Sequence, residues 1–113
     1  MNKRMTKLIA SALLALDMTM ALPVAAADNR AGGIAFDNNS CGSCHAASTS
    51  TIGPSLKDIA KRYKGKPVAA ELAQRIRAGS EGRWGGPAHP AYEGLDPADA
   101  LLIATWILGG AAR

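Results

Sequence analysis

The sequence predicts an all-α domain, and two patterns along the chain support this prediction. Apolar side chains recur about every three or four residues in several stretches after residue 30, which is the spacing of one face of a helix. Glycine and proline residues separate these stretches, at points where they would end one helix and begin another. The part of the chain after residue 27 contains no internal repeat, no paired strand pattern and no low-complexity segment.

The first expected helix covers residues 30–39 and carries Gly32 and Phe36 on one face, one turn apart. A glycine inside a helix lowers its stability, so its presence here suggests the close approach of another helix. The alternative is a frayed segment without such packing. The polar residues at 38–40 should end this helix.

The second expected helix follows a loop over residues 46–52 and a Gly-Pro turn at 53–54. Ser55 is placed to cap it, with Asp58 three residues further on. Its apolar stripe has helical spacing and consists of Leu56, Ile59, Ala60 and Tyr63. The basic residues off this stripe suit a solvated face or, alternatively, a face that meets an acidic partner: Lys57, Lys61, Arg62 and Lys64.

Two further helices are expected. After Gly65, Pro67 is placed to open the third at its first position, and Gly79 should end it. Residues 80–97 then form a loop rich in glycine and proline, and Asp96 is placed to cap the last helix, which ends at Gly109. The apolar positions of the third helix are Val68, Leu72 and Ile76, and those of the last are Leu102, Ile103, Trp106 and Ile107.

Residues 1–27 have the pattern of a cleaved secretory signal peptide. Lys3, Arg4 and Lys7 precede an apolar stretch at 8–22, and alanines at 25–27 suit a signal peptidase. The alternative is a membrane anchor, but the apolar stretch is interrupted by a charge and is shorter than the roughly 20 residues that span a bilayer. We therefore expect a mature domain of residues 28–113, without stable membrane insertion, in the periplasm.

The charge balance does not indicate nucleic-acid binding. The chain has 13 Lys and Arg residues against 9 Asp and Glu residues, a formal net charge of +4. Half of that charge belongs to the predicted signal peptide, so the mature domain is only slightly basic.

Cys41, Cys44 and His45 form the motif C-x-x-C-H, the attachment signature of c-type haem. The two thiols would add to the haem vinyl groups as thioethers, and the histidine would lie beneath the ring, where its imidazole can bind iron. A redox disulfide is an alternative, but it would be expected within a βαβ pattern. A zinc site usually needs a second pair of ligands, and the chain has only 2 cysteines.

Residues 30–108 resemble class I cytochromes c, and among them the small bacterial cytochromes that donate electrons to nitrite reductase or cytochrome c peroxidase. The resemblance is most specific in four strings: CGSCH at 41–45, IGPSLKD at 52–58, AELAQRI at 70–76 and GSEGRWG at 79–85. It implies the class I cytochrome c fold, with about four to five short helices wrapped around one covalently bound haem c. The haem would also staple a domain whose own core is thin.

The resemblance also implies roles for individual residues. Pro54 would offer its carbonyl oxygen to the nitrogen of His45 that does not bind iron. Arg75 and Trp84 would donate hydrogen bonds to a buried haem propionate, the alternatives being a solvated helix residue and plain core packing. The first and last helices would cross, with Gly32 and Phe36 against Trp106.

One position departs from the family. The loop after Trp84 normally delivers a methionine to the second face of the iron, and His89 stands at that position here. All 4 methionines of the chain precede residue 28. The resemblance therefore implies His45 and His89 as axial ligands. Tyr92, a lysine or water are the other candidates. Lysine competes poorly, because it must first lose a proton from a group with a pKa of about 10.

An iron with a histidine bound on each face has no free position for a substrate. The leading hypothesis is therefore that the protein is not an enzyme but a monomeric electron carrier with redox protein partners. A second hypothesis is gas-ligand binding or sensing, if His89 is displaced easily or does not bind. A third, peroxidase activity, would need an acid–base group near an open iron, and the chain has only 2 histidines.

Overall fold

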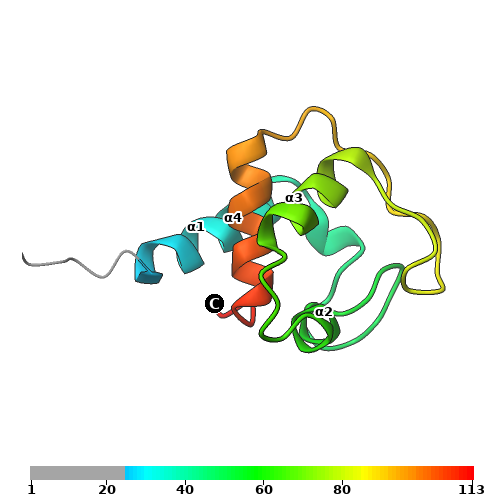
Figure 1. The fold of residues 1–113 in the computed structure, drawn as a ribbon, viewed down its shortest axis with the longest axis horizontal. Helices are drawn as coiled ribbons and strands as arrows, with labels where there is room; N and C mark the ends of the chain where they lie inside the picture. The colour runs from blue at the N-terminus through cyan, green and yellow to red at the C-terminus, as the bar shows by residue number, and fades with distance from the viewer. Residues whose placement is uncertain (1–24) are drawn as a thin grey trace, which may run out of the picture.

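The structure is a computed structural model that describes residues 25–113. The helices are α1 (Ala25–Asn38), α2 (Leu56–Arg62), α3 (Ala69–Ala78) and α4 (Pro97–Leu108), with one 3-10 turn, η1 (Cys41–Ser43). Within residues 25–113 the only β pairing is an isolated bridge between Ser80 and His89. The all-α prediction is confirmed (Figure 1).

The predicted signal peptide lies outside the described residues up to position 24, so its cleavage stays a prediction. The first helix begins at Ala25 and not at the expected residue 30. The extra turn is rich in alanine, the residue with the highest helix propensity. None of the helices in residues 25–113 has the length and apolar character needed to cross a membrane.

The fold is arranged around α4, which contacts α1, α2 and α3 (Figure 1). The Asp96 side chain accepts a hydrogen bond from the Ala98 amide at 2.7 Å, and Pro97 occupies the first turn, as the sequence predicts. Most of the helix surface is then covered by its neighbours, and the buried side chains of α4 are Ala100, Ile103, Ala104, Trp106 and Ile107.

The predicted crossing of the first and last helices is confirmed. A Cβ atom at Gly32 would overlap the Trp106 side chain and the Leu102 carbonyl, so only glycine lets α1 approach α4 this closely. One turn further along, the rings of Phe36 and Trp106 lie 5.1 Å apart between centroids. Both side chains are buried.

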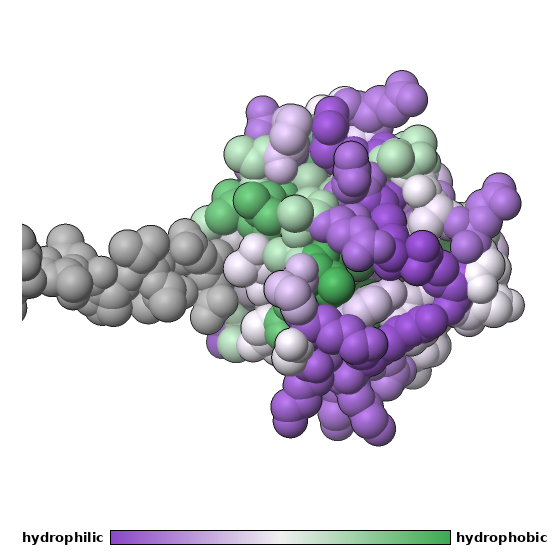
Figure 2. All heavy atoms as spheres, in the orientation of Figure 1, coloured by the Kyte–Doolittle hydropathy of each residue, from purple (hydrophilic) through white to green (hydrophobic). Residues whose placement is uncertain are grey.

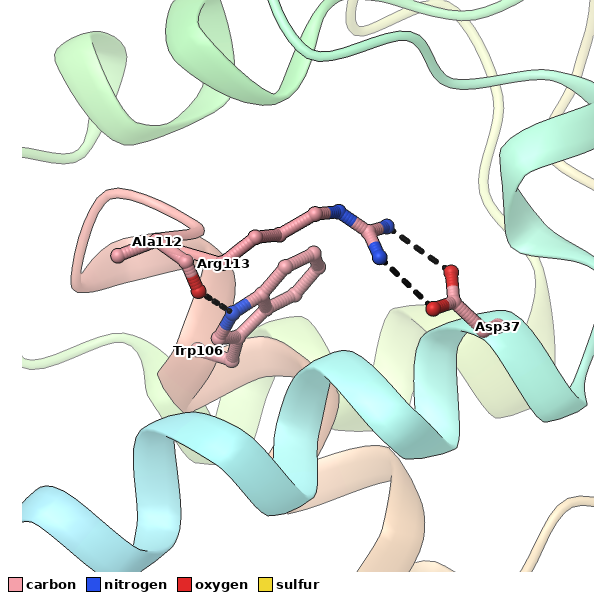
Figure 3. Close-up of polar contacts among 4 residues, drawn as sticks. All are labelled: Asp37, Trp106, Ala112 and Arg113. Atoms are coloured by element: carbon pink, nitrogen blue, oxygen red, sulfur yellow. Dashed lines mark hydrogen bonds and ion pairs between the residues drawn. The ribbon is translucent and has the colours of Figure 1, made fainter.

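The last residues of the chain fold back over this crossing (Figure 3). The Trp106 indole N–H donates to the Ala112 carbonyl at 3.0 Å. The Arg113 guanidinium pairs with both carboxylate oxygens of Asp37 on α1, at 2.7 and 2.9 Å. This hydrogen-bonded pairing holds the pKa of Asp37 below its ordinary value.

The expected cap of α2 is confirmed, because the Ser55 hydroxyl accepts a hydrogen bond from the Asp58 amide at 3.1 Å. The expected start of α3 is wrong: the helix begins at Ala69, and Pro67 does not open it. The Val68 amide donates to the Lys66 carbonyl at 2.9 Å, so residues 66–68 form a tight turn, and Pro67 lies inside this turn.

The outer surface differs between the two sides of the molecule. Figure 2 shows hydrophobic residues gathered toward the side where α1 enters, and hydrophilic residues over the opposite side, which carries α2 and the loop between α3 and α4. The basic residues of α2 that the sequence places off its apolar stripe are exposed.

Candidate functional site

A cavity of about 380 Å³ is lined by residues of α2, α3, α4 and the loop between α3 and α4. Every helix and both long loops contribute to its wall. Its apolar lining includes Phe36, Ile59, Leu72, Ile76, Leu95, Ile103 and Ile107. The residues that the sequence singles out for the site also line it: Cys41, Cys44, His45, Pro54, Arg75, Trp84 and His89.

The C-x-x-C-H motif forms one wall of this cavity in a single tight turn. The amides of Cys44 and His45 both donate to the Cys41 carbonyl, at 3.2 and 3.1 Å. Ser40 enters the turn with a left-handed backbone, φ 57°. Both cysteines are partly buried, and they form no disulfide with each other.

The His45 ring is fixed from one side by the segment that follows. Its Nδ1 lies 2.7 Å from the Pro54 carbonyl oxygen. A carbonyl oxygen can only accept, so Nδ1 is the donor in this contact, and in the neutral ring the lone pair would then be on Nε2. A neutral imidazole held in this tautomer is a ready metal ligand.

Gly53 is a part of the site that the sequence reasoning missed, because the Gly-Pro pair was interpreted only as a turn. A Cβ atom at Gly53 would lie 2.5 Å from Cε1 and 2.9 Å from Nδ1 of His45. The imidazole therefore lies against the glycine backbone. No spacing pattern predicts this contact; the only signal was the position of Gly53 inside the string that resembles the family.

His89 lies across the cavity from His45. The two ring centroids are 6.2 Å apart, and the ring planes differ by 28°. A metal–imidazole bond of about 2 Å, with about 1 Å from nitrogen to ring centre on each side, gives about 6 Å across a metal bound between two rings. The separation therefore leaves room for one metal atom.

The state of His89 also suits a ligand. Its Nδ1 contacts the Pro90 carbonyl oxygen at 2.8 Å, which directs the proton to Nδ1, as at His45. Burial lowers the pKa of His89, and the nearby His45 lowers it further, against the opposing effect of the Pro90 contact. The neutral imidazole is therefore the form present at neutral pH.

Arg75 and Trp84 lie on the same side of the cavity. The Arg75 side chain is only 18% exposed, donates to the Tyr63 hydroxyl at 3.2 Å and pairs with Glu71. Trp84 is 39% exposed and also lines the cavity.

Arg62 holds the Trp84 segment, and the sequence did not indicate this. Its guanidinium stacks over the indole at 4.3 Å and donates to the Arg83 carbonyl at 2.6 Å. The contact joins α2 to a loop about twenty residues away in sequence.

Known proteins identify the family to which this geometry belongs. The family model described as Cytochrome c matches residues 30–111. The chain therefore belongs to the cytochrome c family, and within it to the small bacterial class I cytochromes that carry a single haem.

Individual relatives are similar across the same region. Cytochrome c-551 of Pseudomonas aeruginosa is 41% identical over 76 residues, 66% of this chain and 72% of that protein. Cytochrome c-552 of Nitrosomonas europaea is 45% identical over 71 residues, 62% of this chain and 69% of that protein. The crystal structure of wild-type Nitrosomonas europaea cytochrome c552 superposes with a TM-score of 0.64 at 42% identity, covering 67% of this chain and 95% of that one.

The residues of this chain fit the covalent haem c of the family. Two cysteines that form no disulfide line an apolar cavity. His45 follows them in the same turn, and its Nδ1, not its Nε2, contacts the Pro54 carbonyl oxygen. The protein is thus an electron-transfer cytochrome with one haem c per chain.

Proposed function

We propose that this protein is a periplasmic electron carrier in which His45 and His89 bind the two faces of the haem iron. The 6.2 Å separation of the two imidazole rings across the cavity carries this proposal. The haem iron supplies one-electron exchange between its ferric and ferrous states. The residues of the chain would hold the haem and position its ligands.

The chain would fix both ligands so that they need not move during electron exchange. The Pro54 carbonyl accepts a hydrogen bond from His45 and raises the basicity of its Nε2. Gly53 keeps the His45 ring close against the backbone. Cys41 and Cys44 would hold one edge of the ring system through thioether bonds.

Arg75 and Trp84 would donate hydrogen bonds to a haem propionate at the opposite edge. Both side chains line the cavity, and a guanidinium and an indole N–H are donors only. Tyr63 and Arg62 contact these two residues and would hold them in place. A propionate that is bound in this way is kept ionised at a partly buried position.

With both faces of the iron bound by histidine, no position remains for a substrate, so the protein would exchange electrons and catalyse no reaction. We propose that it works as a monomer with redox proteins as donor and acceptor, binds no nucleic acid and is exported through its signal peptide.

Spectroscopy of the purified protein tests the ligand assignment. The oxidised protein should be low-spin and should lack the near-infrared sulfur-to-iron band of methionine-ligated relatives. His89→Met should restore that band and raise the reduction potential, because methionine ligation raises the potential of a haem. His89→Ala should give a high-spin protein that binds carbon monoxide.

High-spin iron in the wild-type protein at neutral pH would contradict the assignment, and so would an unchanged spectrum in His89→Ala. A large spectral change when carbon monoxide is added to the reduced wild-type protein would instead favour gas-ligand binding.

A further inference from the structure

The backbone of His89 is fixed, although the residue lies in a long loop. The His89 amide donates to the Ser80 carbonyl at 2.7 Å, and the Ser80 amide donates to the His89 carbonyl at 3.2 Å. Three residues further on, the Tyr92 amide donates to the Arg77 carbonyl at 2.9 Å. These bonds attach the segment around His89 to the end of α3.

The part of the loop between the bridged residues is held much less firmly. Within the described chain, residues 81–88 make one hydrogen bond to the rest of the protein, from Arg62 to the Arg83 carbonyl. The Ser80–His89 bridge therefore closes the base of the loop. It holds the His89 backbone without any hydrogen bond from residues 81–88.

The bridge depends on Gly79, the residue that follows α3. Gly79 has φ +82° and ψ 167°, a backbone region that is essentially restricted to glycine. A Cβ atom at this position would lie 2.9 Å from the His89 carbonyl oxygen and 3.2 Å from the Ala91 amide nitrogen. Any side chain would thus push directly on the backbone of residues 89–91.

We propose that Gly79 is a positioning residue for the sixth ligand: it lets the end of α3 pair with the His89 backbone, and this pairing sets where the imidazole meets the iron. The inference rests on the proposed ligation by His89. It implies that His89 is not displaced easily, because its backbone cannot move away without breaking the bridge.

The test is Gly79→Ala, with Gly65→Ala as the matched control. Gly65, in the turn after α2, has φ +73°, and a Cβ atom added there would meet no other atom within 4 Å. Gly65 also does not line the cavity. Both substitutions place alanine at a positive φ, but only Gly79→Ala also presses on the His89 backbone. The difference between them therefore reports the requirement for glycine at position 79, which includes both its backbone conformation and its contact with residues 89–91.

In Gly79→Ala we expect His89 to bind the iron about 10–100-fold more weakly, the usual effect of disturbing a group that orients a metal ligand. The measurements are the high-spin fraction of the oxidised protein, the affinity of the reduced protein for carbon monoxide, and the reduction potential. Gly65→Ala should keep the wild-type value of each. Equal effects in both variants, or a wild-type spectrum and carbon monoxide affinity in Gly79→Ala, would overturn the proposal.

Hydrogen exchange of the wild-type holoprotein gives a second test if Gly79→Ala does not fold. The His89 amide should be protected far more strongly than the amides of Gly85 and Gly86 in the same loop. Equal exchange rates would overturn the proposal. The spectrum of His89→Ala distinguishes failure of the proposed ligation from failure of the role of Gly79. An unchanged spectrum in His89→Ala would contradict ligation by His89. A high-spin His89→Ala together with a wild-type-like Gly79→Ala would contradict only the role of Gly79.

Discussion

The α1–α4 crossing and the cavity side of the molecule are held together in different ways. At the crossing, Gly32, Phe36 and Trp106 pack directly, with no space between the helices. On the other side, α2 and α3 each contact α4, but within the described residues they do not pack against each other. The side chains of α2 and α3 face a cavity of about 380 Å³.

This difference indicates which half can form from its own side chains and which half needs the haem. A domain of this size buries little apolar surface, and small domains commonly need a disulfide, metal or comparable staple. The crossing is packed from the chain's own apolar side chains, with Phe36 against Trp106. The cavity side would gain its core from a haem bound in the cavity that α2, α3 and α4 line.

The largest effect is expected from losing haem attachment. Cys41→Ala or Cys44→Ala should give little folded protein, because the cavity side then has no covalently held core. The wild-type protein should retain haem on a denaturing gel. Extraction of all the haem from wild-type protein into acid-acetone would contradict thioether attachment at these cysteines.

The crossing itself is tested by Trp106→Ala. We expect a loss of about 3–5 kcal/mol in the free energy of unfolding of the holoprotein, the usual range for truncating a large aromatic residue in a core. Denaturant titration measures this loss. A loss well under about 1 kcal/mol would contradict the view that the crossing is the firmly packed half.

Gly53→Ala tests how closely the backbone on the cavity side packs against the His45 ring. The added methyl group would meet the His45 ring, and overpacking of this kind usually costs about 1–3 kcal/mol. Gly42→Ala is the matched control, since its Cβ atom would make only an ordinary 3.7 Å contact with Phe36. Unfolding and the haem spectrum should change in the first variant only; equal behaviour would mean that Gly53 does not support the ring.

The smallest effect concerns the ion pair of Asp37 and Arg113 beside the crossing. Because Arg113 lowers the pKa of Asp37 below its ordinary value of 3.8, the pair adds stability above that pH and loses it as the pH falls through the lowered pKa. Both groups are exposed, so salt should weaken the effect. In denaturant titrations, wild type should be slightly more stable than Asp37→Asn at neutral pH, and this difference should shrink at acid pH. A difference that stays constant across this pH range would contradict the prediction.

Local sequence patterns predicted the start of a helix correctly where a capping side chain fixes it. Ser55 and Asp96 cap the helices that they were expected to cap, since a side chain reaching an amide two or three residues away needs no tertiary contact. The prediction that Pro67 begins α3 was wrong, because residues 66–68 form a tight turn and the helix starts after it. Nothing in the spacing of apolar residues distinguishes these two outcomes.

The haem attachment motif, the order of the helices, the absence of methionine after residue 27 and the glycine at the helix crossing can be read from the chain alone, since each depends on residue identity and short-range spacing. The surroundings of the two histidines are visible only in the fold. The Gly53 backbone beside His45, the Arg62 stack on Trp84 and the Ser80–His89 bridge join residues that a folded chain alone brings together. Such contacts depend on how helices and loops meet in space, and no periodicity within a single segment encodes them.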